Sequence, residues 1–439
     1  MSGLSRDSAN ARVLRTDVDR RSVVKSMLFA GGTLLFSGFG RADRAVAQDN
    51  IRLVHMYHQY GEEGTEAAVR RYAEQYTEEN PNVEIEIIWQ LGDYGQALNA
   101  ALLTDEAPDV FEHGTRVPVD LVRQGQVAPL DDLYTDEVRA GFNEVSLASA
   151  TIDGSIYWVK MLDDTGCIYY RKSLLEEAGV EPPETLDALI EAAQALNTGR
   201  QKGLFVGNDG GISGLLGPLC WSANGRFLNE DNTAPAFNTE RVAAAYTKLR
   251  DLNQTDALLM GAPTDWWDPS SFIQGLAAMV WGGFWAMPQI LREVGAEDVG
   301  VLPWPKADDE GTPATFWGGW GQCVFGKGQH IDAAKAYVKW LWIDNTEIQQ
   351  DWNLGYGFHV PPRIEAAESA EPLQEPPASD VAGFLNDYGV VDPPQWTGAM
   401  GTALQDAVTR IVREDADAMT ELNAAAETVQ SELDRLQEG

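Results

Sequence analysis

The regular alternation of strand-like and helix-like segments in residues 51–111 constrains the fold of this chain most. Residues 51–56 are mostly apolar, residues 83–89 alternate in polarity and become apolar, and residues 108–111 begin a third short run. Between them, residues 65–80 and 94–103 carry apolar side chains at helical spacing. A strand–helix–strand–helix–strand order with this spacing predicts a parallel sheet in an α/β fold.

The ends of these predicted elements carry recognisable signals. Thr65 is placed to cap the first helix, and Asn80 and Pro81 end it. In parallel sheets, ligands bind outside the carboxyl ends of the strands. Here those ends include residues 57–60 and 112–116, so we expect functional side chains there.

The N-terminal 47 residues have the pattern of an export signal. Arg20 and Arg21 precede an apolar run at residues 27–39, and Ala45-Val46-Ala47 offers small residues at both outer positions of a cleavage site. The apolar run is shorter than the ~20 residues that a membrane-spanning helix needs. We therefore predict a twin-arginine signal peptide over residues 1–47 and a mature protein that is periplasmic or extracellular and associated with the cell surface.

The chain is strongly acidic, with 67 acidic and 32 basic residues and a net charge of −35. Such a surface repels nucleic acid and anionic lipid, and it is typical of a solvated surface adapted to high salt. A length of 439 residues indicates two or three domains. Cys167, Cys220 and Cys323 lack metal or redox spacing, so we interpret them as small buried residues, with one disulfide as the alternative.

A Trp-Gly-Gly pattern occurs twice in the second half of the chain, at residues 281–283 and 317–319, each followed within two residues by a further aromatic side chain. Trp281 follows the apolar run Met279-Val280, which favours a place in a hydrophobic core. Glycine beside an indole allows another group to approach the backbone closely. The two segments are therefore candidate parts of a binding site.

Several segments, taken in order, resemble the extracellular solute-binding proteins of ABC importers, in the carbohydrate-binding group related to maltose-binding protein. No single motif is specific, but the ordered set covers nearly all of residues 51–439. One departure lies at Thr185-Leu186-Asp187, where relatives usually carry Trp before an acidic residue. The resemblance is carried by residues 98–103 with 107–110, 121–132, 153–157, 168–179, 272–280, 301–303 and 333–337.

The resemblance implies an α/β, two-lobed periplasmic-binding-protein fold of class II, the Venus-flytrap type, with three hinge crossings. We expect the crossings near Lys160, Pro303 and Trp342. Lobe 1 would then comprise residues 48–160 and 303–343, and lobe 2 residues 161–302 and 344–439. The ligand would lie in the cleft, and closure would be a hinge motion coupled to binding.

A sugar has polar edges and C–H faces, so its receptor needs flat aromatic surfaces together with carboxylates, amides or Arg. The resemblance places Trp285 of lobe 2 at a sugar-stacking position. Trp317 and Trp320 would face it from lobe 1.

Polar candidates also follow from the resemblance. His113 and Arg116 would reach into the cleft from lobe 1, and Asp164 would stand beside the hinge, although Asp163-Asp164 could instead be a solvated turn and His113 a surface residue. Trp221 and Asn224 match a segment that bears lobe 2 contacts. Further wall candidates are Tyr57, Tyr60, Tyr356 and Trp396.

The sequence gives no support for catalysis, a cofactor or a metal site. HExxH, CxxC and phosphate-loop patterns do not occur, and Gly326-Lys327-Gly328 lacks the residues that a phosphate loop requires. We expect a monomeric binding protein that hands a carbohydrate to a membrane permease and its ATPase subunits. The alternatives are a binder of a polyol, compatible solute or glycerol phosphoester, a chemotaxis receptor partner, and a secreted carbohydrate-active hydrolase.

Overall fold

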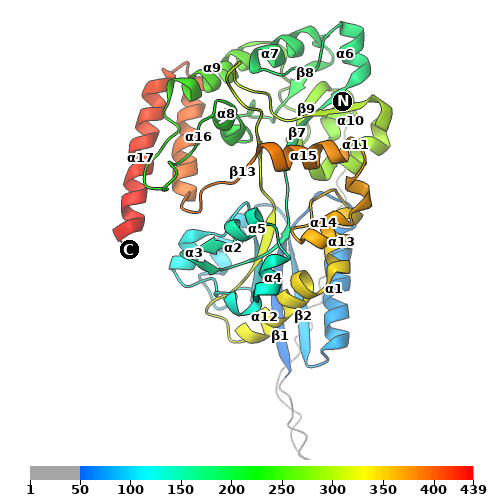
Figure 1. Cartoon of the computed structure of the whole chain (residues 1–439), viewed down its shortest axis with the longest axis vertical. Coiled ribbons are helices and arrows are strands. Elements are labelled where there is room, and N and C mark those ends of the chain that lie inside the picture. The colour runs from blue at the N-terminus through cyan, green and yellow to red at the C-terminus, as the bar shows by residue number, and fades with distance from the viewer. Residues whose placement is uncertain (1–49, 439) are drawn as a thin grey trace, which may run out of the picture. The chain divides into compact units, whose positions relative to one another are not determined.

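The computed structural model of the protein describes residues 50–438. The predicted signal peptide, residues 1–47, lies outside this range. The described residues form two lobes, each with its own sheet and hydrophobic core (Figure 1). Within residues 50–438, none of the helices combines the length and apolar character needed to cross a membrane.

The first lobe is built on a five-stranded sheet in the order β2-β1-β3-β12-β6. β1 pairs in parallel with β2 and β3, whereas β12 runs antiparallel to β3 and β6. The predicted parallel βαβ unit is thus confirmed. The strands are β1 Ile51–His58, β2 Val83–Gln90, β3 Val110–Gly114, β6 Val159–Leu162 and β12 Trp320–Val324.

Helices cover both faces of this sheet and bury their apolar positions against it. In α1, Val69, Tyr72 and Tyr76 are buried, as their helical spacing predicts. The predicted cap at Thr65 is wrong, because Gly64 with φ 95° precedes the helix and the Thr65 hydroxyl donates to the Glu62 carbonyl at 2.7 Å. The helices of this part are α1 Thr65–Glu79, α2 Tyr94–Ala101, α3 Val119–Arg123, α4 Asp136–Ala140, α5 Glu144–Ser149, α12 Ile331–Lys339 and α13 Thr346–Gly355, and α14 Ile364–Glu368 follows α13.

The second lobe is built on a four-stranded sheet in the order β10-β7-β9-β8. β9 runs antiparallel to β7 and parallel to β8. The strands are β7 Gly166–Arg171, β8 Lys202–Phe205, β9 Ala277–Gly283 and β10 Val299–Leu302. The helices are α6 Lys172–Ala178, α7 Leu186–Ala195, α8 Leu216–Ser222, α9 Glu240–Gln254, α10 Ser270–Ile273, α11 Met287–Val294, α15 Ala378–Tyr388, α16 Gly398–Arg413 and α17 Ala418–Glu438.

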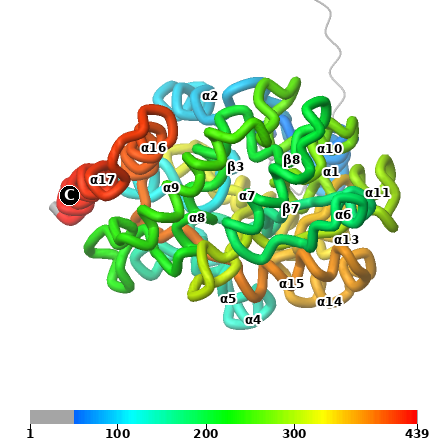
Figure 2. The backbone as a smooth tube through the Cα atoms, turned by 90° about the horizontal axis from the view of Figure 1, so that it is seen from above, coloured from blue at the N-terminus to red at the C-terminus, as the bar shows by residue number. Residues whose placement is uncertain are grey.

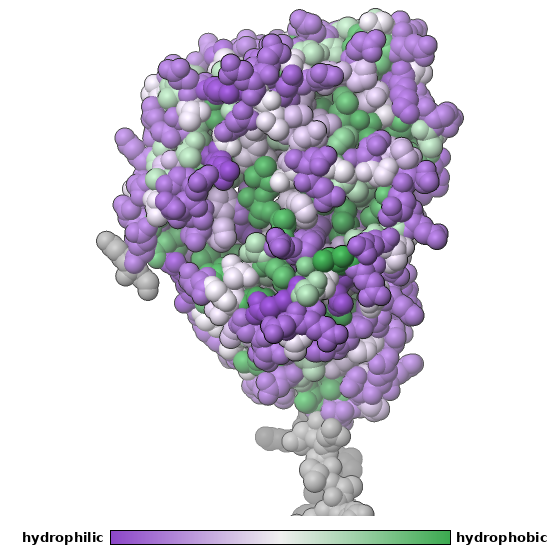
Figure 3. Space-filling view, in the orientation of Figure 1, coloured by the Kyte–Doolittle hydropathy of each residue, from purple (hydrophilic) through white to green (hydrophobic). Residues whose placement is uncertain are grey.

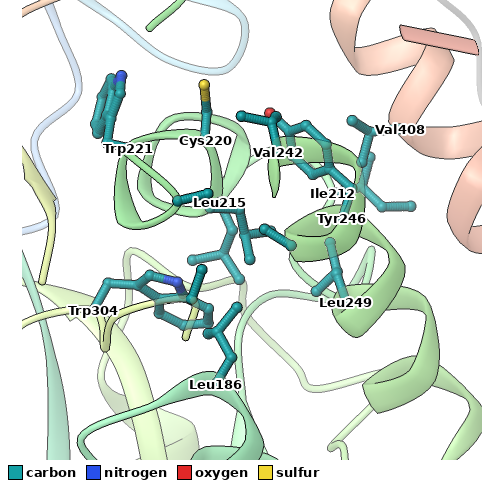
Figure 4. Close-up of a cluster of buried hydrophobic side chains, with 14 of the residues drawn as sticks. Leu186, Ile212, Leu215, Cys220, Trp221, Val242, Tyr246, Leu249, Trp304 and Val408 are labelled. Carbon is teal, nitrogen blue, oxygen red and sulfur yellow. The ribbon is translucent and has the colours of Figure 1, made fainter. Parts of the chain in front are cut away.

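The core of the second lobe joins α7, α8, α9 and α16. Leu215, Tyr246 and Leu249 lie between these helices with Val408, and each is at most 2% exposed (Figure 4). Trp281 is fully buried on β9 with its ring 5.7 Å from that of Trp304, which confirms the core placement expected for it.

The three cysteines are free and completely buried. Burial raises the pKa of the Cys167 thiol to about 12, which keeps it protonated at neutral pH. Packing is therefore their structural role, and the disulfide alternative is wrong.

The segments that cross between the lobes are joined by backbone hydrogen bonds at Asp163 and Asp164. Asp163 exchanges two bonds of 2.9 Å with Val360, and Gly318 N donates to Asp164 O at 2.8 Å. The first crossing, residues 163–165, is therefore bonded to the segments around Gly318 and Val360. Three chain segments bound side by side form a compact hinge.

For the second and third crossings we propose positions later in the chain than those expected from the sequence. Trp304 and Ala314 pack in the second core, and Trp317 N donates to Val390 O, so the chain returns to the first lobe only after residue 317. Trp352 of α13 packs in the first core, and Ile364 N donates to Gly141 O at 2.9 Å, so the chain is still in the first lobe at residue 364. We propose crossings at residues 163–165, at residues 317–319, and between α14 and Leu373, which packs in the second lobe, because these contacts fix the lobe to which each segment belongs.

Two short strand pairs complete the fold. β11 Thr315–Phe316 pairs in parallel with β13 Gly389–Val390, and β4 Thr151–Ile152 pairs with β5 Ser155–Ile156. Asp153 and Gly154 both have positive φ in the turn between β4 and β5, as a tight hairpin requires. Seen from above, α16 and α17 lie on one side and α13 and α14 on the other (Figure 2). Most of the face in Figure 3 is hydrophilic.

Candidate functional site

A cavity of about 290 Å³ lies between the lobes. Thr115, which follows β3, belongs to the first lobe, whereas most of the wall comes from α8, α16 and the segments around β11 and β13. The lining residues are Thr115, Ser213, Gly214, Leu216, Gly217, Pro218, Trp221, Phe227, Trp266, Phe316, Trp317, Val390, Asp392, Trp396 and Leu404.

Four tryptophans line this one cavity: Trp221, Trp266, Trp317 and Trp396. Trp396 is held by stacking on Phe227, with ring centroids 4.6 Å apart. The indole nitrogen of Trp317 is buried without a hydrogen-bond partner. Its N–H is therefore a donor that the protein itself leaves unused.

The charged groups at the cavity are paired across the lobes. Arg116 Nη1 donates to Asp392 Oδ2 at 2.8 Å, and Arg116 Nη2 donates to the Trp396 carbonyl. Burial raises the pKa of Asp392 although Arg116 opposes this, and burial lowers the pKa of Arg116. The lining thus presents aromatic faces and the Asp392 carboxylate, whose charge is balanced by Arg116.

A second pocket of about 620 Å³ shares Trp221, Phe227 and Val390 with the cavity. Asn224 lines it, but its amide donates to the Glu310 carbonyl at 2.9 Å. The neighbouring Asn229 amide is likewise bonded within its own turn. These amides are engaged in loop structure.

Trp320 belongs to a separate aromatic wall in the first lobe. Its ring stacks on His58 at 3.8 Å, and Tyr60 lies on the other side at 3.8 Å from His58. Beneath them the fully buried Glu112 accepts from the Tyr60 hydroxyl at 2.8 Å. Burial, followed by the Glu112 charge, raises the pKa of Tyr60, so this hydroxyl remains a donor.

The adjacent carboxylates at the hinge have different partners. Asp163 accepts from Ser146 Oγ at 2.6 Å and lies 3.3 Å from Lys160 Nζ. Asp164 Oδ1 lies 2.7 Å from His359 Nδ1. Both carboxylates are buried, so the solvated-turn alternative is wrong.

His359 is charged at neutral pH. Burial lowers its pKa, but the neighbouring Asp164 and Glu62 carboxylates outweigh burial and raise the pKa to about 10. Glu62 Oε1 is 3.3 Å from His359 Nε2. Burial raises the pKa of Asp164, against the effect of His359. Glu62, Asp164 and His359 thus form an ionic link beside the crossings.

The remaining expected residues lie elsewhere. Trp285 donates its indole N–H to the Trp267 carbonyl at 2.9 Å, and its ring is 5.8 Å from that of Trp266. It therefore backs a cavity residue. Tyr57 is fully buried and accepts from Gln322, Tyr356 accepts from Arg71, and His113 is half-buried beside the Gly114 carbonyl.

Of the twelve expected residues, the structure thus gathers Trp221, Trp317 and Trp396 in the cavity lining, with Arg116 across from them. Sequence reasoning missed Trp266, Asp392 and the hinge residue His359. Trp266 could have been found from the sequence, because Trp266 and Trp267 stand between Asp265 and Asp268. Two aspartates seldom flank residues of a hydrophobic core. His359 had no such signal, because its partners are distant in sequence.

Among residues 50–438, no group of three or more His, Cys, Asp or Glu side chains is arranged to hold a metal ion.

The fold and the interlobe cavity are those of a two-lobed binding protein. The sequence model of the family described as bacterial extracellular solute-binding protein matches residues 61–341, and the chain belongs to this family. Membership indicates a periplasmic or extracellular location. The maltotriose-binding protein of Pyrococcus abyssi is 22% identical over 349 residues, which cover 78% of this chain and 74% of that protein.

Solved structures confirm the two-lobed α/β fold. The GacH receptor of Streptomyces glaucescens, solved unliganded and with acarbose or a homolog of it, has a TM-score of 0.74 at 22% identity and covers 87% of this chain and 98% of its own. UgpB from Mycobacterium tuberculosis, in complex with glycerophosphocholine, has a TM-score of 0.73 at 19% identity and covers 87% of this chain and 98% of its own.

Proposed function

We propose that this chain is the extracytoplasmic binding component of an ABC importer and that it captures a sugar, oligosaccharide or glycoside without chemical change. The observation that carries the proposal is the set of four indoles around one interlobe cavity. Indole faces match the C–H faces of a sugar ring. Thr115 and Ser213 supply hydroxyl groups.

An uncharged ligand fits this cavity best. Asp392 is the only ionisable side chain in the lining, and Arg116 compensates its charge. A glycerol phosphoester, the ligand class suggested by the UgpB complex, would need a cation that is free to pair with its phosphate. A glycosidase would need two carboxylates facing the bond, and the comparisons give no support to the hydrolase alternative. A polyol or compatible solute remains the second candidate, because it shares the hydroxyl chemistry.

We further propose a monomer that delivers its ligand to a permease served by cytoplasmic ATPases. The Arg20-Arg21 pattern supports export by the twin-arginine route, and the net charge of −35 supports adaptation to high salt. Binding would stabilise the closed arrangement of the lobes by its differential affinity for that state.

A thermal-shift screen of the mature chain tests the proposal. Mono-, di- and trisaccharides, polyols and glycerophosphodiesters would be compared, and a ligand at 100 times its Kd adds about 2.7 kcal/mol to stability. We expect a saccharide to raise the melting temperature and to be recovered unchanged after unfolding. A shift only with a polyol or a phosphodiester would replace the proposed ligand class, and cleavage products would replace binding with hydrolysis.

A further inference from the structure

Arg116 lies where the two lobes meet and makes its hydrogen bonds to the opposite lobe. It follows β3 of the first lobe, whereas both of its partners, Asp392 and the Trp396 carbonyl, lie between β13 and α16 of the second lobe. The Arg116 and Asp392 side chains are only 17% and 19% exposed. A ligand hydroxyl would therefore have to compete with these bonds for the guanidinium group.

A second interlobe contact begins four residues further along the chain. Asp120 of α3 pairs with Arg435 of α17 at 3.3 Å, and Arg123 donates to the Leu436 carbonyl. The last carbonyls of a helix lack intrahelical donors, so an arginine side chain is a favourable partner for them.

The two contacts are tied together within the second lobe. Glu432 accepts from Arg435 at 2.7 Å and from Thr397 at 3.2 Å. Thr397 is the N-cap of α16 and directly follows Trp396. The residues bonded to Arg116 and those bonded to α3 are therefore connected through the peptide bond between Trp396 and Thr397 and the hydrogen bonds of Glu432.

The α3–α17 contacts of this set lie far from α13 and α14, whereas the Arg116–Asp392 pair lies closer to the second crossing, because Thr115 N donates to Gly319 O at 2.7 Å. Figures 1 and 2 show α17 extending along one side of the protein toward α3, with α13 and α14 on the opposite side. In a hinge rotation, the parts farthest from the hinge move most. The contacts between α3 and α17 at this edge therefore must break when the lobes separate.

We propose that Arg116, Asp120 and Arg123, together with Asp392 and the end of α17, form a clasp that holds the lobes closed and thereby sets the ligand affinity. Arg116 acts as a positioning residue in this device, because it bonds the opposite lobe and brings the cavity walls together. The proposal rests on the proposed function for its effect on affinity, but closure itself can be measured without ligand.

The buried pair contributes most to the clasp. Arg435 and Asp120 are 58% and 43% exposed, so solvent screens their attraction. Arg116 and Asp392 are largely desolvated, so removing one partner leaves the other charge unpaired in the closed state. That state is then disfavoured, and the apparent Kd rises as the closed fraction falls.

Small-angle scattering of the mature chain without ligand tests the clasp. We expect Arg116→Gln and Asp392→Asn to increase the radius of gyration, and the charge-swapped pair Arg116→Asp with Asp392→Arg to restore it in part. Arg171→Gln is the matched control, because Arg171 and Asp298 form a comparably buried pair, each 21% exposed, within the second lobe. An unchanged radius in both single variants, or an equal increase in the control, would overturn the clasp.

A second pair of variants keeps the test valid if the buried substitutions impair folding. Arg123→Gln with Arg435→Gln alters the α3–α17 contact at the surface and should increase the radius of gyration by a smaller amount.

A saccharide found in the thermal-shift screen should bind the Arg116→Gln variant at least about fivefold more weakly. Loss of affinity with an unchanged radius would instead make Arg116 a ligand contact. Failure of every saccharide in the screen would refute the proposed function and leave the scattering result to decide the clasp.

Discussion

The segments at residues 281–285 and 317–320 share the Trp-Gly-Gly pattern, but the fold uses them differently. The first belongs to β9, where Trp281 is fully buried in the second core. The second contains the crossing that we propose at residues 317–319, with Trp317 at the cavity and Trp320 at the start of β12 on the first-lobe aromatic wall. The comparison teaches that the pattern indicates close backbone packing in both places, whereas the sheet or crossing that contains it decides its role.

The largest expected effect is that of Trp281→Ala, which tests the core role of the first segment. Removing a fully buried indole leaves a cavity and should lower the free energy of unfolding by about 3–5 kcal/mol. Urea denaturation followed by circular dichroism measures this. The matched variant Trp317→Ala should lose far less stability, and equal losses would break the comparison.

The third residues of the two patterns provide a backbone test. A Cβ on Gly319, which has φ +108°, would lie 2.2 Å from the Leu162 carbonyl oxygen, so Gly319→Ala should destabilise by about 2–5 kcal/mol. The three atoms nearest to a Cβ on Gly283 would all belong to the Trp285 ring, at 2.2 Å, and Gly283 has φ −85°, so Gly283→Ala adds a side-chain clash without backbone strain and should cost less, about 1–3 kcal/mol. Thermal unfolding of both variants measures the difference, and the reverse order would contradict a rigid crossing.

The ionic link of Glu62, Asp164 and His359 beside the crossings should make the free energy of unfolding depend on pH. The pKa of His359 is raised to about 10 from 6.5, so its contribution is complete below pH 6.5 and is lost as the pH rises toward 10. We expect the stability difference between wild type and His359→Gln to shrink by about 2–4 kcal/mol between pH 7 and 10. Denaturation at several pH values measures it. A difference that does not change with pH would show that His359 is not charged in the folded protein.

Binding should depend on the second segment through Trp317. Trp317→Ala removes an aromatic wall, so we expect a loss of about 2 kcal/mol, or roughly thirtyfold in Kd, for a saccharide identified by the thermal-shift screen. Calorimetry measures the affinity. Trp320→Ala is titrated alongside it for comparison, because the Trp320 indole stacks on His58 and does not line the cavity. Undiminished affinity in Trp317→Ala would remove it from the site.

The smallest expected effect is that of Trp285→Ala. Its indole backs Trp266 and donates to the Trp267 carbonyl, so the variant should weaken binding by less than about 1 kcal/mol through Trp266. The same calorimetric titration applies. A loss as large as that of Trp317→Ala would restore the direct stacking role that the family resemblance assigns to Trp285.

Local patterns in the sequence were sufficient for the first elements but not for the kind of site. Apolar periodicity predicted α1, α2 and the parallel strands around β1, whereas the expectation of a sugar site came from the family resemblance. Trp304 and Trp352 could not be assigned to a lobe in advance, because nothing in their neighbourhood tells which sheet they pack against.

The sequence by itself therefore determined the α/β class, the order of the first elements and the core role of Trp281, since these follow from side-chain spacing and hydrophobicity over a few residues. The tertiary structure alone decided which indoles share a cavity, that Arg116 meets Asp392, and that Asp164 meets His359. The physical reason is that these partners lie 195 to 276 residues apart. Only the packing of two sheets and three crossings brings them together.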